Sequence, residues 1–146
     1  MRLLQILNNK KSETNHFLTK TPLEQFSELN VEFFESAKMS LLDPLGVYLA
    51  NDVKWIKLNE KWNSLKFPVV VGGKGPPILL LHGFDSSFLE FRRIYQSLKR
   101  NFQVIIPDLL GFGFSPRCAT NEYTPSKIIT YLIDILDTLK IKNNLK

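Results

Sequence analysis

Short apolar runs alternate with longer amphipathic segments along this chain, a pattern typical of an α/β protein. Apolar and β-branched residues dominate residues 53–58 and 65–71, and these two stretches predict an antiparallel pair of strands. Unbroken apolar runs at 78–81 and 103–107 predict two further strands, each buried on both faces as in a parallel sheet. The predicted fold class is therefore α/β, with antiparallel leading strands followed by parallel strands.

Three segments with apolar residues at helical spacing begin with helix-capping signals. Thr-Pro-Leu-Glu at 21–24 and Ser-Phe-Leu-Glu at 87–90 both have the spacing of a capping box, in which the acidic side chain reaches back to the capping residue. Thr-Pro at 124–125 opens the third helix. Its broad apolar face predicts that it covers a sheet, and that face comprises Ile128, Ile129, Leu132, Ile135, Leu136 and Leu139.

The composition of the 146 residues is that of a globular protein, with 44% hydrophobic and 23% charged residues. The net charge of +5 is spread along the chain, and the densest basic cluster is only Lys54, Lys57, Lys61 and Lys66. Nucleic-acid binding needs basic residues concentrated on one face, so no nucleic-acid partner is predicted. No apolar run approaches the ~20 residues that span a bilayer, and no transmembrane segment is predicted.

The sequence contains one cysteine, Cys118, which excludes an internal disulfide framework and a zinc site of several thiolates. A reducing compartment, the cytoplasm, is the predicted location. We interpret Cys118 as an incidental thiol, because no partner histidine lies near it in the sequence. No acidic and histidine residues cluster at ligand spacing, so neither a metal site nor a cofactor is predicted.

The candidate chemistry lies in two loops that follow the predicted parallel strands, residues 82–87 and 108–117. Ligands of open α/β sheets bind at the carboxyl ends of the strands, which is where both loops begin. Gly83 allows the backbone to approach a bound group closely, and N–H groups before the following helix can donate to an anion. The carboxylate of Asp108 can accept from N–H groups of its own loop.

These two loops together resemble the N-terminal half of the α/β-hydrolase family. The resemblance rests on a buried strand followed by His82-Gly83, a helix, a second strand, and then Pro-Asp-x-x-Gly-x-Gly-x-Ser-x-Arg from Pro107 to Arg117. It covers roughly residues 52–142. It implies that the backbone N–H of Phe84 supplies half of an oxyanion hole, with His82 and Gly83 supporting the loop and the Phe84 side chain lining an acyl pocket. It also implies that Asp108, Gly111, Gly113 and Ser115 hold the second loop in place.

The sequence departs from the family in its catalytic residues, because it contains no Gly-x-Ser-x-Gly. Its two histidines, His16 and His82, both precede the point at which the family places its base. Ser86, Ser87 and Ser115 have no base placed to activate them, and we interpret them as capping or turn residues.

We therefore expect three parts: a flexible tail at 1–20, an amphipathic helical extension at 21–50, and at 51–146 the N-terminal part of an α/β-hydrolase domain truncated before the nucleophile turn. Such a chain should be inactive alone and should need a C-terminal hydrolase half as partner, with a small acyl substrate. His-Gly-Phe-Asp differs from the His-Gly-x-Pro loops of epoxide hydrolases and haloalkane dehalogenases, which favours carboxylic esters. The alternative is a non-catalytic relict or interaction module on a hydrolase-derived scaffold.

Overall fold

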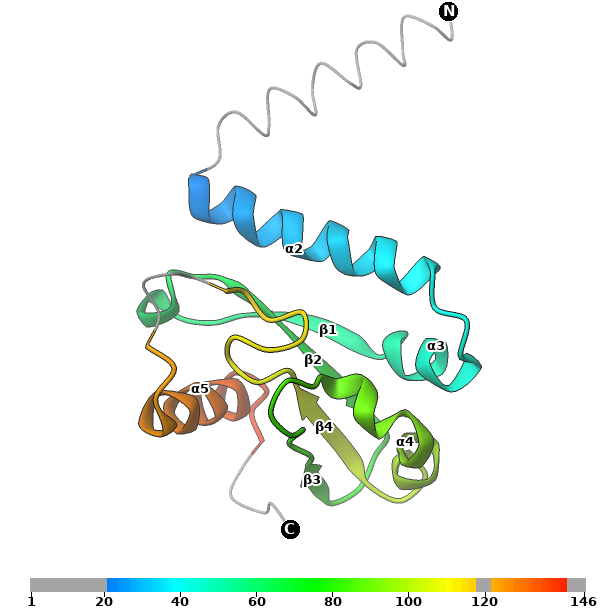
Figure 1. The fold of residues 1–146 in the computed structure, drawn as a ribbon. Coiled ribbons are helices and arrows are strands. Elements are labelled where there is room, and N and C mark those ends of the chain that lie inside the picture. Colours follow the sequence, from blue (N-terminus) through cyan, green and yellow to red (C-terminus); the bar gives the residue numbers. More distant parts are fainter. Residues whose placement is uncertain (1–20, 118–121, 142–146) are drawn as a thin grey trace, which may run out of the picture.

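A mixed sheet of four strands lies between two layers of helices (Figure 1). The computed structural model describes residues 21–117 and 122–141, so the predicted tail at 1–20, His16 and Cys118 lie outside the described residues. The sheet has the order β1-β2-β4-β3. Its strands are β1 (Val53–Lys57), β2 (Lys66–Gly72), β3 (Pro77–Leu79) and β4 (Gln103–Pro107).

The strand pairing confirms the predicted mixture of directions. β1 and β2 are antiparallel, with Trp55 opposite Pro68. β3 and β4 are parallel, with Ile78 opposite Val104, and β2 joins the two pairs by running antiparallel to β4. The α/β class and the order of antiparallel then parallel strands are therefore confirmed.

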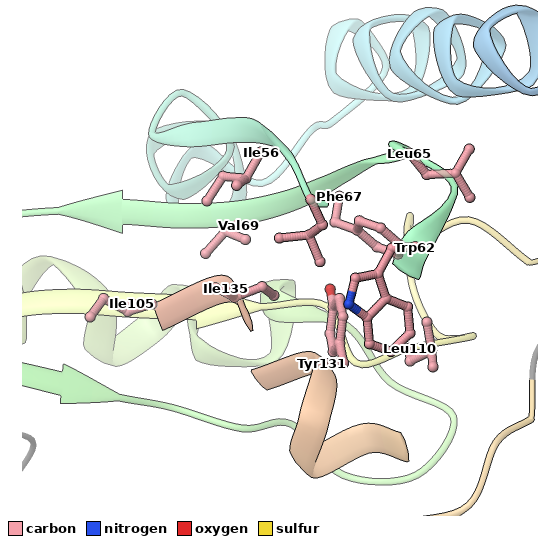
Figure 2. Packing of buried hydrophobic residues seen from close by; sticks show 10 residues of the cluster. Ile56, Trp62, Leu65, Phe67, Val69, Ile105, Leu110, Tyr131 and Ile135 are labelled. Atoms are coloured by element: carbon pink, nitrogen blue, oxygen red, sulfur yellow. The ribbon is translucent and has the colours of Figure 1, made fainter. Parts of the chain in front are cut away.

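Alternation along the strands sends side chains to two apolar clusters, one on each face of the sheet. Phe67, Val69 and Ile105 enter the first cluster together with residues of α5 (Pro125–Thr138). Figure 2 shows the indole of Trp62 and the rings of Phe67 and Tyr131 meeting at one end of this cluster. The second cluster lies on the opposite face, and its strand residues are Val70, Val104 and Ile106.

Helix α5 begins where Thr124 was predicted to cap it, and the Thr124 side chain accepts from the backbone N–H of Lys127. The predicted apolar face was wrong at one position, because Ile129 is 58% exposed. Tyr131, which is fully buried, faces the sheet instead. Tyr131 carries a hydroxyl group and was not counted as a core residue in the sequence pattern, although its ring is large and apolar.

Two helices precede the sheet. α2 (Pro22–Met39) begins with the predicted capping box, since Thr21 and Glu24 exchange both hydrogen bonds. α3 (Pro44–Ala50) begins within Asp-Pro-Leu-Gly at 43–46, a sequence that by itself indicates a turn, and Asp43 caps it. In Figure 1, α2 runs along the β1 side of the sheet. Phe26 of α2 contacts the first cluster and Phe34 belongs to the second, so the helix is part of the protein's own core.

The helical segment between β3 and β4 begins differently from the prediction. It starts as a 3-10 turn, η2 (Phe88–Phe91), and continues as α4 (Arg92–Lys99). The Ser87 hydroxyl accepts from the N–H of Leu89, as an N-cap does. The predicted capping box is wrong, because the Glu90 carboxylate accepts from the N–H of Gly83 and not from that of Ser87.

The two outer strands of the sheet differ in charge and in burial. The prediction that residues 78–81 are buried on both faces is wrong, since Ile78 and Leu79 are half-buried and Leu81 is 44% exposed. Within the described residues β3 pairs only with β4, which leaves its other edge open. β1 carries Lys54 and Lys57, and lysines on an outer strand oppose pairing with a further strand. The β3 edge has no such charge.

No helix in residues 21–117 or 122–141 is both long enough and apolar enough to cross a bilayer.

Candidate active site

The two loops singled out in the sequence, residues 82–87 and 108–117, lie side by side at the end of the sheet where β3 and β4 have their carboxyl ends (Figure 1, green and yellow). They follow β3 and β4, which are parallel, so both leave the sheet at the same edge. Two hydrogen bonds link them in opposite directions. The N–H of Leu109 donates to His82 Nε2 at 2.9 Å, and the N–H of Phe88 donates to Asp108 Oδ1 at 2.6 Å.

Asp108 is the central group of the second loop, as the resemblance implied. Its side chain is fully buried, and its second oxygen accepts from the N–H of Phe114 at 2.6 Å. Burial raises the pKa of Asp108 to about 7, against the lowering effect of the two N–H donors and of Arg117. Gly113 lies against this carboxylate: a Cβ there would come within 2.2 Å of Asp108 Oδ2, and the glycine has a φ of +54°.

The remaining groups of the second loop hold its backbone. The hydroxyls of Ser115 and Tyr131 both donate to the carbonyl oxygen of Asp108, each at 2.9 Å. Arg117 donates to the carbonyl oxygens of Gly111 and Gly113. Ser115 is buried and bonded in this way, which agrees with its interpretation as a turn residue rather than a nucleophile.

Both nitrogens of the His82 imidazole are engaged. Because Nε2 accepts from the N–H of Leu109, the ring proton lies on Nδ1, which is 2.8 Å from the carbonyl oxygen of Gly83 and donates to it. Asp108 Oδ1 lies 3.8 Å from Nε2, beyond hydrogen-bond distance. The ring thus braces both loops and has no free nitrogen with which to take a proton from a substrate.

The bond from His82 to the carbonyl of Gly83 constrains the direction in which the N–H of Phe84 points. The carbonyl of Gly83 and the N–H of Phe84 belong to one planar trans peptide group, so they point in opposite directions. Among the described residues, no acceptor takes a hydrogen bond from the N–H of Phe84. The Phe84 ring is 90% exposed and lies 5.3 Å from the ring of Phe112.

The space around Gly83 is open. A Cβ built on Gly83 would meet no atom within 4 Å, so the chain's own packing does not require glycine here. Asp85, two residues later, has a φ of +53°, a left-handed conformation that is strained for a residue other than glycine.

Sequence reasoning missed the role of Glu90. Its carboxylate oxygen Oε2 accepts from the N–H of Gly83 at 3.2 Å, seven residues earlier in the chain. This bond and one from the Ser86 side chain lower the pKa of Glu90. The capping-box spacing pointed to a partner within its own helix, and nothing in the sequence distinguishes the two partners.

Known proteins match this part of the chain. A family model described as "alpha/beta hydrolase fold" matches residues 76–144. Cis-3-alkyl-4-alkyloxetan-2-one decarboxylase of Shewanella oneidensis is 33% identical over 85 residues, which are 57% of this chain and 27% of that protein. A 2-hydroxymuconate semialdehyde hydrolase of a Pseudomonas species is 32% identical over 73 residues, 48% of this chain and 26% of that protein.

Among solved structures, the meta-cleavage product hydrolase of Pseudomonas fluorescens superposes with a TM-score of 0.55 at 28% identity. The superposition covers 61% of this chain and 32% of that one. The chain spans about a quarter of the length of the curated relatives that it matches.

Proposed function

Because residues 76–144 of this chain belong to the α/β-hydrolase fold family, we propose that the chain forms the N-terminal part of a serine hydrolase acting on carboxylic esters or related acyl substrates. Its part in the reaction is to supply one donor of the oxyanion hole, the backbone N–H of Phe84. The nucleophilic serine and the base come from a C-terminal hydrolase half, and without that half the chain is inactive.

One observation carries this proposal: the N–H of Phe84 has no acceptor among the described residues and lies at the carboxyl edge of the parallel strands. His82 fixes the peptide group to which that N–H belongs, and Gly83 leaves its surroundings open. A backbone N–H that is held in place, has no partner and lies in open space is suited to donate a hydrogen bond to an oxygen atom of a substrate.

The expected chemistry is acyl transfer. The serine oxygen adds to the carbonyl carbon of the ester while the base takes the serine's proton, and negative charge develops on the carbonyl oxygen. The N–H of Phe84 donates to that oxygen. One such donor is worth ~2.7–4 kcal/mol of transition-state stabilisation. The alcohol then leaves as the base returns the proton to it, and water later releases the acid.

The open edge of β3 supports a partner at this site. A strand pairing in parallel with β3 would end beside residues 82–84, where the nucleophile is needed. It would also cover Ile78, Leu79 and Leu81, which are now partly exposed. The lysines of β1 disfavour the opposite edge as the place of attachment. The single cysteine of the sequence suits a reducing compartment such as the cytoplasm.

The test uses the chain alone and the chain coexpressed with the polypeptide encoded immediately downstream. We expect no labelling of any serine of the chain alone by a fluorophosphonate probe, and hydrolysis of p-nitrophenyl butyrate by the coexpressed pair. Stoichiometric labelling of the chain alone would refute the assigned role. A pair without hydrolysis would instead support the non-catalytic interaction module.

A backbone variant tests the role of Phe84 in the active pair. Phe84→Pro removes the N–H donor, and we expect a loss of about 10²–10³-fold in kcat. Phe84→Ala keeps the N–H and is the matched control, so its loss in kcat should be much smaller than that of Phe84→Pro. Equal losses in both variants would show that the side chain, and not the N–H, carries the effect.

A further inference from the structure

The geometry points to Glu90 as a positioning residue: we propose that its carboxylate, by accepting from the N–H of Gly83, sets the conformation of residues 82–85 and so the direction of the Phe84 N–H. The importance of that direction rests on the proposed function, whereas the contact itself does not. Neither the capping-box pattern nor the family resemblance assigns this role to Glu90.

Both peptide groups that meet at the Gly83 Cα are hydrogen-bonded to side chains. The Glu90 carboxylate accepts a hydrogen bond from the N–H of the peptide group between His82 and Gly83. The His82 ring donates one to the carbonyl oxygen of the peptide group between Gly83 and Phe84. Two planar groups that meet at one Cα are related only by φ and ψ of that residue. Glycine allows a wide range of both angles, so the two hydrogen bonds must supply the restriction that a side chain would otherwise give.

The backbone of residues 83–85 needs a hydrogen bond from outside this segment to hold its conformation. Gly83, Phe84 and Asp85 are all exposed, and Asp85 has a left-handed φ of +53°. Strained backbone persists only where the surrounding structure holds it. Glu90 supplies such a hold from outside these residues, because it lies on η2 and accepts from the N–H of Gly83 seven residues earlier.

Several charged groups face Glu90. An open hollow beside the loop is lined by Glu90, Asp85, Arg92 and Arg117, and the His82 ring also acts electrostatically on Glu90. Arg92 already bonds Asp43, and Arg117 already bonds carbonyl oxygens of its own loop. Neither guanidinium is hydrogen-bonded to Glu90, so the carboxylate keeps Gly83 as its partner.

The test measures backbone amides of the 146-residue chain by NMR. In Glu90→Ala the Gly83 amide loses its hydrogen bond to a charged acceptor. We therefore expect its amide proton to exchange with solvent about tenfold faster or more. The Phe84 amide cross-peak should shift as well. Glu90→Gln, which keeps an acceptor but loses the charge, should give an intermediate rate. Exposed Glu32 on α2 offers the control Glu32→Ala, with both amides unchanged.

A pH titration separates Glu90 from its neighbours. On acidification the Gly83 amide proton of the wild type should shift with a midpoint below the ordinary glutamate value, and Glu90→Gln should abolish that shift. If the shift survives in Glu90→Gln, Asp85 or His82 causes it and the proposal fails. It also fails if Gly83 exchange is the same in Glu90→Ala and wild type. Unchanged β4 amides show that each variant is folded. Because no nucleophile is needed, these results are independent of the hydrolysis assay.

Discussion

The stability of this protein should fall as the pH rises from 5 to 8, which is opposite to the usual effect of a carboxylate. The cause is Asp108, whose pKa is raised to about 7 in the folded state by burial, from an ordinary value of 3.8. Between these two values the folded chain holds a proton that the unfolded chain has lost. Raising the pH therefore favours unfolding, and the effect ends above the folded-state pKa.

The size of the effect follows from the same two values. Each pH unit between them costs about 1.4 kcal/mol, so the two units from pH 5 to pH 7 cost about 3 kcal/mol of unfolding free energy. The carboxylates whose pKa is lowered, Asp43, Glu90 and Asp134, act in the other direction, but only at pH values below their ordinary range of 3.8–4.5. None of these three carboxylates contributes between pH 5 and pH 8.

Urea unfolding, followed by the fluorescence of Trp55 and Trp62, measures this free energy at several pH values. Asp108→Asn does not titrate, so its unfolding free energy should lack the fall of about 3 kcal/mol between pH 5 and pH 8. Asp43→Asn removes a carboxylate with a lowered pKa and should keep the fall. The reasoning is refuted if wild type is equally stable at pH 5 and pH 8, or if the fall persists in Asp108→Asn.

Further substitutions test the packing of the second loop. Gly113→Ala should lower the urea midpoint, because its Cβ would collide with the Asp108 carboxylate and its φ is positive, whereas Gly83→Ala should leave the midpoint unchanged. Ser115→Ala and Tyr131→Phe each leave the carbonyl of Asp108 with one donor, so each should cost about 1 kcal/mol. The double variant leaves that carbonyl without either donor and should cost about 1 kcal/mol more than the sum, which a double-mutant cycle measures. Strict additivity would contradict the shared acceptor.

The strands and the main helices were predictable because they depend on local alternation and on capping residues. Thr21 and Thr124 cap the helices predicted from them, and the strand directions follow from the apolar pattern. α3 was missed even though Asp43-Pro44 is the same kind of signal, because the segment is short and its glycine was interpreted as part of a turn. Pattern reasoning favours long elements.

The site residues were predictable by type but not by partner. The family resemblance implied that His82 supports its loop, yet which nitrogen bonds which loop depends on the packing of β3 beside β4. Glu90 was assigned to the wrong N–H because two backbone donors compete for it, and a sequence does not contain the geometry that decides between them.

The crossed hydrogen bonds between the two loops constrain how such a site can be re-engineered. His82 of the first loop accepts from Leu109 of the second, and Asp108 of the second accepts from Phe88 at the end of the first. Each loop therefore contains a donor that only the other can satisfy. A graft that replaces either loop with a segment lacking His82 or Asp108 would leave the donor of the other loop without its acceptor, so such loops have to be transplanted, or evolve, as a matched pair.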